Sequence, residues 1–463
     1  MQQTPRLPEA LGEYAGMQPA RFHMPGHKGR GMAGFFRPEL AGWDVTELSV
    51  SDNLHAPASV IARAQEECAA VYGAKHTFFL VNGATAGIAA MLLALPQGAR
   101  LLLGRDCHRS ALSGAALAGH ACRFVQPAYE PGFGLWGPVA PEALETALCE
   151  SPADAVLITS PNYYGLCADI PALARAAHEH GALLFVDAAH GAHFPFSEAL
   201  PQSPAGYADA WVVSAHKTMN ALGQAAMLHT GPALPVFAVQ HALSMVQTSS
   251  PSYLLLASID WAVFTARKDN CWTQEVNRCT ALAQSIEKLL GLRTLPRELI
   301  GRAGIADMDA TRVIVDVSAR GITGYRAARA LEAQNVFVEL ADSRRIGCIC
   351  TPADDPAWYD ALLEALQALP YGLEPPAPSP AYPAPPRVMD VREAARGRTE
   401  ACPLPECAGR IAADCAGLYP PGIPVWTPGE RITPECVALL LSQQALGAVL
   451  FGVTDGRALV VCE

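Results

Sequence analysis

Short apolar runs alternate with helical patterns between about residues 56 and 231. Helical spacing of apolar residues is clearest over 88–95 and 171–180. The apolar runs between such patterns are continuous, which is typical of strands that are buried on both faces. We therefore predict an α/β fold with a mainly parallel, seven-stranded sheet that is covered by helices. The seven predicted strands are 77–81, 100–104, 122–125, 155–159, 183–187, 211–214 and 225–228.

Proline and glycine place the boundaries of the first helices. Pro57 lies in the first turn of a predicted helix at 56–72, and Gly73 is placed to end it. The strand at 77–81 then leads through the loop 82–87 into the next helix. A strand, a glycine-bearing loop and a helix N-terminus together form a site that suits an anion.

The rest of the chain divides by pattern and composition. In a smaller domain, 312–317 is a predicted strand and 325–333 a predicted helix. Near the C-terminus, apolar runs at 448–453 and 458–461 flank a turn at 455–456 and predict a hairpin. The predicted parts are an N-terminal segment at 1–55, a large domain at 56–289, a small α/β domain at 290–369, a proline-rich linker at 370–386 and a C-terminal α+β domain at 387–463.

The composition of the chain indicates which classes of molecule it can bind. Hydrophobic residues make up 51% and charged residues 17% of the 463 residues, which is apolar enough to predict a large subunit interface. The formal charge of −11 and the lack of lysine and arginine clusters argue against nucleic acid as a partner. No apolar run approaches the ~20 residues that a membrane helix needs, and the N-terminus lacks a signal-peptide pattern. We therefore expect a cytoplasmic protein without a membrane partner.

The sequence does not predict a metal site. The fourteen cysteines are scattered, and their local groupings fit no zinc module, so we expect reduced, mostly structural thiols. His23 and His27 have the spacing of helical zinc ligands, but Pro25 and Gly26 between them break the helix that this spacing requires. His190 is more plausible as a cofactor neighbour or a structural group than as a metal ligand.

Two clusters of reactive side chains follow consecutive predicted strands. Asp187 ends the strand at 183–187, and Ser214, His216 and Lys217 stand at the end of the next strand. Ligands of α/β sheets bind at such strand ends. A lysine can form a Schiff base with the aldehyde of pyridoxal 5'-phosphate (PLP), a serine and a histidine can hold its phosphate, and an aspartate can keep its ring nitrogen protonated. The spacing therefore predicts a PLP site.

Each candidate also has an ordinary structural explanation. Lys217 alone could be a surface lysine, and Asp187 could cap a helix. A glycine-containing turn such as the one at 83–85 is common before helices. His108 could stack on an aromatic cofactor ring or could be a polar loop residue. The agreement between the two strand ends and the anion loop favours the cofactor site.

Together these motifs resemble the bacterial ornithine/lysine/arginine decarboxylases, which are fold-type I (aspartate aminotransferase-like) PLP-dependent enzymes with an added C-terminal domain. The resemblance covers nearly the whole chain, and its most specific segment is 419–430, a proline-rich loop that ends in Glu430. The chain begins close to the motif in 22–29, which resembles the short, biosynthetic members. The other matching segments are 44–48, 82–85, 187–194 and 214–217.

The resemblance implies a role for each candidate residue. Lys217 would form the internal aldimine, Asp187 would pair with the pyridine nitrogen, and His108 would stack on the ring. Thr248 and Ser249 resemble a segment that a partner subunit lends, which implies a homodimer or higher homo-oligomer with the active site at the interface. Contacts to the cofactor are implied for Gly83, Ala84, Thr85, His108, Asp187, His190, Ser214, His216, Lys217, Thr248 and Ser249, with Thr85, Ser214 and His216 at the phosphate.

The implied reaction is decarboxylation of a basic amino acid to the amine and carbon dioxide in polyamine biosynthesis. Glu430 would bind the distal cation of the substrate, because a carboxylate can pair with an ammonium or a guanidinium group. Arginine is the first choice of substrate and lysine or ornithine the next, and the sequence does not separate them. Departures from the family pattern at Ala84, Ala86 and Gly223 bear on cofactor affinity more than on reaction type. Two alternatives stay open: a PLP-dependent aminotransferase or lyase, and a non-catalytic binding or regulatory protein on this fold.

Overall fold

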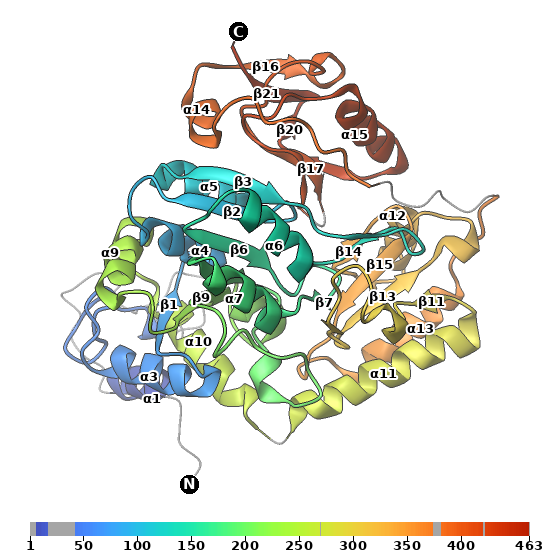
Figure 1. Cartoon of the computed structure of the whole chain (residues 1–463). Helices are drawn as coiled ribbons and strands as arrows, with labels where there is room; N and C mark the ends of the chain where they lie inside the picture. The colour runs from blue at the N-terminus through green and yellow to red at the C-terminus, as the bar shows by residue number, and fades with distance from the viewer. Residues whose placement is uncertain (1–5, 17–41, 269, 374–380, 420–421, 463) are drawn as a thin grey trace. The chain divides into compact units, whose positions relative to one another are not determined.

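The computed structural model describes residues 6–16, 42–268, 270–373, 381–419 and 422–462 (Figure 1). The motif in 22–29, with His23 and His27, lies outside the described residues, as do 374–380 of the predicted linker and 420–421 of the C-terminal loop. The chain forms two compact units, and both draw on separate stretches of sequence. The first comprises 1–95, 185–198 and 202–272, and the second comprises 96–184, 199–201 and 273–463.

The largest sheet has seven strands and is mainly parallel, as predicted. Strand β10 runs antiparallel to both of its neighbours, β1 and β9, whereas β8 and β9, β2 and β6, and β2 and β3 pair in parallel. All seven predicted strands are confirmed, with ends shifted by no more than two residues. Their order is β1 (His76–Leu80), β10 (Ala226–Thr230), β9 (Ala210–Val213), β8 (Leu183–Asp187), β6 (Ala155–Thr159), β2 (Arg100–Gly104) and β3 (Ala121–Val125).

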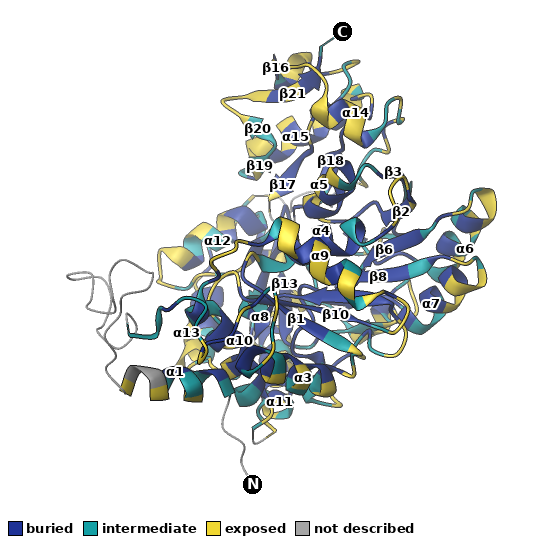
Figure 2. Cartoon of the chain, turned by 90° about the vertical axis from the view of Figure 1, so that its left-hand side faces the viewer, coloured by how far each residue is buried: buried dark blue, intermediate teal, exposed yellow. Residues whose placement is uncertain are grey.

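The strands are buried because their side chains are apolar on both faces. Every residue of β9 and β10 is buried. By contrast, α6 (Pro141–Glu150), α7 (Ile170–Glu179) and α9 (Val236–Val246) carry exposed residues, which are yellow in Figure 2. This is the burial that the continuous apolar runs predict. In the first unit, the helices are α1 (Arg6–Gly16), α3 (Val60–Tyr72), α4 (Gly83–Leu93), α8 (Ala215–Thr218), α9 (Val236–Val246) and α10 (Tyr253–Ala266).

The predicted helix at 56–72 begins later than expected. It starts at Val60 and ends at Tyr72, and Gly73, which was predicted to end it, caps it in the left-handed conformation with φ +64°. The carboxylate of Asp52 accepts hydrogen bonds from the backbone N–H groups of Ser59 and Ile61, at 2.8 and 3.0 Å. Burial alone would raise the pKa of Asp52, but hydrogen bonds from backbone N–H groups, chiefly those of Ala58 and Ser59, outweigh it and lower the pKa. A cap seven or more residues upstream therefore sets the start of the helix, and Pro57 lies before it.

The second unit contains a smaller sheet whose strands pair antiparallel. A four-stranded sheet orders β11 (Arg293–Thr294), β13 (Arg312–Asp316), β15 (Arg345–Ile349) and β14 (Leu340–Ala341). Helix α12 (Gly324–Glu332) confirms the helix predicted at 325–333, and β13 confirms the strand at 312–317. The remaining helices of this part of the chain are α5 (Arg109–Ala118), α6 (Pro141–Glu150), α7 (Ile170–Glu179), α11 (Cys271–Leu290) and α13 (Pro356–Gln367).

The C-terminal residues form an α+β arrangement with two three-stranded sheets. Their strands are β16 (Thr399–Pro403), β21 (Arg457–Val461) and β20 (Val453–Thr454) in one sheet, and β18 (Pro424–Trp426), β17 (Ala416–Tyr419) and β19 (Val449–Phe451) in the other. Helices α14 (Val391–Arg396) and α15 (Pro434–Leu446) complete it. The hairpin is confirmed between β20 and β21, but the single strand predicted at 448–453 is wrong. Gly452 divides it at φ +73°, where a side chain would meet the Cys415 carbonyl.

Two general features of the described residues bear on the expectations from sequence. No helix among them is long and apolar enough to cross a membrane. All fourteen cysteines are free thiols, and Cys149 is the one that is exposed, whereas the others are buried or half-buried.

Candidate active site

Asp187 and Ser214 lie at the same edge of the seven-stranded sheet. Strands β8 and β9 run in parallel with Asp187 opposite Val212, so Ser214 follows just beyond this pair. The Asp187 side chain is buried, and its Oδ1 accepts a hydrogen bond of 3.1 Å from the backbone N–H of Ala189. The two strand ends therefore present an acid and a hydroxyl together, as the sequence predicts.

Lys217 comes directly after this edge, in the short helix α8. Its Nζ lies 3.1 Å from Nε2 of His190, in the loop that follows β8. His216, beside it, places Nδ1 3.0 Å from the carbonyl oxygen of Ala225. Because a carbonyl oxygen only accepts, Nδ1 of His216 carries the hydrogen. The amine and the two imidazoles thus have defined orientations at the strand ends.

The loop at 82–87 lies next to the residues that follow Lys217. The backbone N–H of Gly83 donates to the carbonyl oxygen of Gln224 at 3.0 Å, and both residues have positive φ, +71° and +76°. Ala84 and Thr85 occupy the first turn of α4, where backbone N–H groups have no partner within the helix. Such a turn attracts an anion.

The Ser214 hydroxyl is buried, with 1% of the residue exposed, and it has no hydrogen-bond partner within the described part of the chain. Leaving a buried hydroxyl unpaired costs free energy, and buried polar groups almost always have a partner. This hydroxyl is therefore available to a polar ligand at the strand end.

Two residues that organise this edge were not found from the sequence. Gln247 is buried, and its side chain accepts from the Val81 N–H at 2.8 Å and reaches the Phe79 carbonyl at 3.4 Å. It fixes the start of the segment with Thr248 and Ser249, which are both exposed between α9 and α10. The sequence signal for Gln247 is a polar residue at the end of an apolar helix. Such residues are too common for this signal to identify a site residue.

Tyr72 is the second residue that the sequence did not single out. Its hydroxyl donates to the Ala192 carbonyl at 2.6 Å and lies 3.4 Å from the Met219 sulfur. Its ring stacks on His229 with 4.3 Å between centroids. Tyr72 therefore ties the loop that bears His190 to the residue just beyond α8.

His108 belongs to the second unit, where it caps α5. Its Nδ1 accepts from the Ser110 N–H at 3.2 Å and lies 2.7 Å from the Ser110 hydroxyl. The exposed residue therefore caps a helix, whereas the alternative considered from the sequence was a polar loop residue. Its stacking on a cofactor ring stays a prediction.

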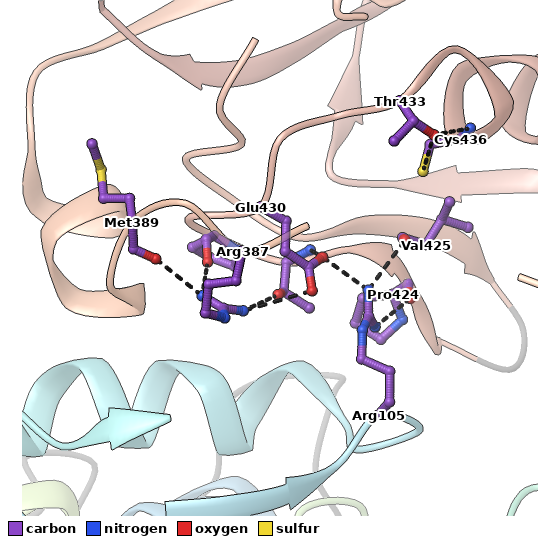
Figure 3. A network of polar contacts seen from close by, with 10 residues as sticks. Arg105, Arg387, Met389, Pro424, Val425, Glu430, Thr433 and Cys436 are labelled. Carbon is purple, nitrogen blue, oxygen red and sulfur yellow. Dashed lines mark hydrogen bonds and ion pairs between the residues drawn. The ribbon is translucent and has the colours of Figure 1, made fainter. Parts of the chain in front are cut away.

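Glu430, also in the second unit, is the centre of a buried polar network (Figure 3). Its Oε2 accepts from Arg105 Nη2 at 3.0 Å and from the Thr427 N–H at 2.8 Å, and its Oε1 lies 3.7 Å from Arg387 Nη2. Only 3% of Glu430 is exposed. The carboxylate that was expected to meet a substrate cation is thus paired with guanidinium groups of its own chain.

The two arginines also hold the backbone around Glu430. Arg105 donates to the carbonyl oxygens of Pro424 and Val425, at 2.8 and 3.1 Å, and Arg387 donates to the Pro428 carbonyl at 2.7 Å (Figure 3). Burial lowers the pKa of Arg387, and the charge of Glu430 opposes that shift. The network fixes the loop before Glu430 to the end of strand β2.

Comparison with known proteins matches both halves of the chain to one family. The family model described as "Orn/Lys/Arg decarboxylase, major domain" matches residues 5–300, and the model of its C-terminal domain matches 382–452. A Bacillus subtilis protein named arginine decarboxylase is 33% identical over 98% of this chain and 96% of its own length.

Solved structures show the same fold. The Escherichia coli constitutive lysine decarboxylase superposes with a TM-score of 0.83 at 19% identity, over 99% of this chain and 82% of that chain. A structure titled as SPT with PLP superposes with a TM-score of 0.50 at 17% identity, over 67% of this chain and 76% of that chain. These likenesses confirm the predicted fold class.

Proposed function

The chain belongs to the Orn/Lys/Arg decarboxylase family, and on this premise we propose that it uses PLP to remove carbon dioxide from a basic amino acid. The observation that carries the proposal is the 3.1 Å contact between Lys217 Nζ and His190 Nε2, beside the strand ends that bear Asp187 and Ser214. A lysine amine beside an imidazole can exchange a proton with it, which suits covalent chemistry with an aldehyde.

The residues at this edge fit the cofactor. The buried Ser214 hydroxyl has no hydrogen-bond partner among the described residues. It would donate a hydrogen bond to a phosphate oxygen of the cofactor. The first turn of α4 adds backbone donors, so the phosphate would be held by Ser214, Thr85, His216 and the amides of Ala84 and Thr85. Gly83, with its positive φ, lets the backbone turn toward that site. When bound, PLP supplies an electron-withdrawing ring that weakens the bond between the substrate Cα and its carboxylate.

The other residues have separate parts in the proposal. Asp187 would hold a proton on the ring nitrogen, because a nearby carboxylate favours the charged form of that nitrogen. Lys217 would anchor the cofactor covalently until the amine of the substrate displaces it, and the freed ammonium group of Lys217 would then deliver a proton to Cα after carbon dioxide leaves. His190 would orient the Lys217 amine and exchange its proton. His108 would stack on the ring.

The partner subunit is part of the proposal. Thr248 and Ser249 are exposed on this chain, and Gln247 fixes the point from which they project. We propose that they reach the phosphate site of a second copy, so that a homodimer is the smallest active unit. A cytoplasmic location is also part of this proposal.

Arginine is the proposed substrate. The relative named arginine decarboxylase is 33% identical over nearly the full length, whereas the structural neighbour named lysine decarboxylase is 19% identical. We propose that Glu430 receives the distal cation by giving up its longer contact, the one of 3.7 Å with Arg387. The amine product, agmatine, would serve polyamine biosynthesis.

Amine and carbon dioxide release from arginine, lysine and ornithine, measured in parallel, tests this proposal. We expect release from arginine to be the fastest and to be lost in Lys217→Ala. Carboxyl-labelled arginine that is converted with its label retained in the product would contradict decarboxylation.

A further inference from the structure

Three side chains that bind metals meet between α6 and α7, on residues that the proposed reaction does not use. Glu145 and Cys149 are four residues apart on α6, so they share one face of the helix, and His180 caps the C-terminal end of α7. His180 Nε2 lies 2.8 Å from Glu145 Oε1 and 3.9 Å from Cys149 Sγ. The Cys149 sulfur lies 3.7 Å from the same Glu145 oxygen.

These distances are close to the edges of a tetrahedral zinc site. Zinc bonds of about 2.3 Å to sulfur and about 2.0–2.2 Å to nitrogen and oxygen give edges of roughly 3.4–3.6 Å between ligand atoms. The two edges that involve Cys149 already measure 3.7 and 3.9 Å. The distance between His180 Nε2 and Glu145 Oε1 would have to lengthen from 2.8 Å. The hydrogen bond between them would then be replaced by one bond from each residue to the metal.

The chemistry of the three groups is that of a site for a borderline cation. A thiolate, an imidazole and a carboxylate together favour Zn²⁺ and its first-row neighbours over Mg²⁺ or Ca²⁺.

An ion can reach this position. Cys149 is the one exposed cysteine of the fourteen, and about a quarter of the His180 side chain and nearly half of the Glu145 side chain are accessible, at 26% and 46%. The described residues contain a second group of possible metal ligands, Glu275, Cys279 and Cys350, which an ion cannot reach in the same way. That group is buried, and Glu275 is already paired with Arg278.

We propose that Glu145, Cys149 and His180 form a binding site for a late first-row divalent cation, with Zn²⁺ preferred and water as the fourth ligand. The bound ion joins the end of α6 to the end of α7. This site departs from the expectation of no metal, and sequence spacing did not reveal it because His180 is 31 residues from Cys149.

Metal titration of the holoenzyme tests the site. Protein with its cofactor is stripped with a chelator and titrated with Co²⁺, whose charge-transfer absorption reports a bound thiolate, and then with Zn²⁺ in competition. We expect one ion per chain. Cys149→Ser and His180→Ala should each weaken binding by tenfold or more, because even residues that only support a metal ligand are worth about 10–100-fold in affinity.

Matched controls keep the test specific to these three residues. Glu142→Gln changes an exposed carboxylate one turn earlier on α6, and Cys462→Ser changes a half-exposed thiol elsewhere. Both should bind as the unmodified protein does. A Zn²⁺-dependent rise in melting temperature, present in both controls and absent in Cys149→Ser, supports the site. Failure to bind Co²⁺ or Zn²⁺, or equal binding and absorption in Cys149→Ser and His180→Ala, overturns it.

Discussion

Arg105 and Glu430 form a buried ion pair across 325 residues of sequence, with Nη2 and Oε2 3.0 Å apart. Arg105 follows strand β2, and Glu430 ends the C-terminal loop. Removing one partner of a buried pair costs more than the pair contributes, because the remaining charge has no counter-ion. Glu430 therefore has a structural role in addition to any contact with substrate.

Glu430→Gln should lower the free energy of unfolding by about 3–5 kcal/mol, since Arg105 would stay buried, and Arg387 half-buried, without a carboxylate. If Glu430 also meets the substrate cation, KM for arginine should rise while PLP affinity changes little. Urea unfolding and steady-state kinetics measure the two effects. Glu435→Gln, an exposed glutamate on α15, is the control. Unchanged stability would contradict the role of the network, and an equal loss of arginine and PLP binding would contradict the substrate role.

Ser214→Ala should separate cofactor binding from stability. Without PLP, the variant should be as stable as the original or more stable by about 1 kcal/mol, because a buried hydroxyl without a partner is removed. With PLP, the dissociation constant should rise about 10–150-fold, because a hydrogen bond to a charged group contributes about 1.5–3 kcal/mol. Fluorescence titration and thermal melting measure these values, and Ser244→Ala is an exposed control. Unchanged PLP affinity would remove Ser214 from the phosphate site.

Asp187→Asn should lower kcat by about two to four orders of magnitude, the range for a group that controls a proton in the reaction. Its amide oxygen can still accept from the Ala189 N–H, so the fold should be retained. The decarboxylation rate and the circular dichroism spectrum check both statements. Asp169→Asn, at the N-cap of α7, should leave kcat unchanged. A rate in Asp187→Asn close to that of the control would contradict the proposed pairing with the ring.

Asp260 should make the protein less stable as pH rises through the acid range. Burial raises the pKa of this carboxyl to about 6, and the N–H of Leu7 opposes the shift with a hydrogen bond of 2.8 Å. Between the unfolded pKa of about 4 and the folded value, the folded chain keeps a proton that the unfolded chain has lost. The contribution to unfolding free energy therefore falls with rising pH, by about 1.4 kcal/mol per pKa unit.

Asp260→Asn should abolish this dependence and should be relatively more stable at pH 8 than at pH 5. Urea unfolding of both proteins at the two pH values measures the difference. A difference between the two proteins that does not change with pH would show that the Asp260 carboxyl has no raised pKa.

The sequence predicted the elements whose signals are local. The seven sheet strands were found because each is a continuous apolar run, and Gly73 marked a helix end by its position alone. The start of α3 was misplaced because its cap, Asp52, acts from outside the helix. The split of the strand at 448–453 depends on the close approach of Gly452 to Cys415, which no local pattern reveals.

The predictions about the site also separate into those with a local sequence signal and those without one. Asp187, Ser214 and Lys217 were predicted to lie together because parallel strand ends carry ligands, and the strand register places Asp187 and Ser214 at the same end of adjacent strands; their roles toward a cofactor stay predictions. The partners of Glu430 were missed because Arg105 is separated from it by most of the chain. Contacts of that kind follow from tertiary packing, and a single sequence does not encode them in any fixed spacing.

The attachment of the cofactor is the most direct test of the proposed enzyme. The holoenzyme is reduced with borohydride, digested and mapped by mass spectrometry for a pyridoxyl group on lysine. We expect the group on the peptide that contains Lys217, and no such label in Lys217→Ala. A label on another lysine, or none in protein that has been saturated with PLP, would contradict the assignment of Lys217 and the reaction built on it.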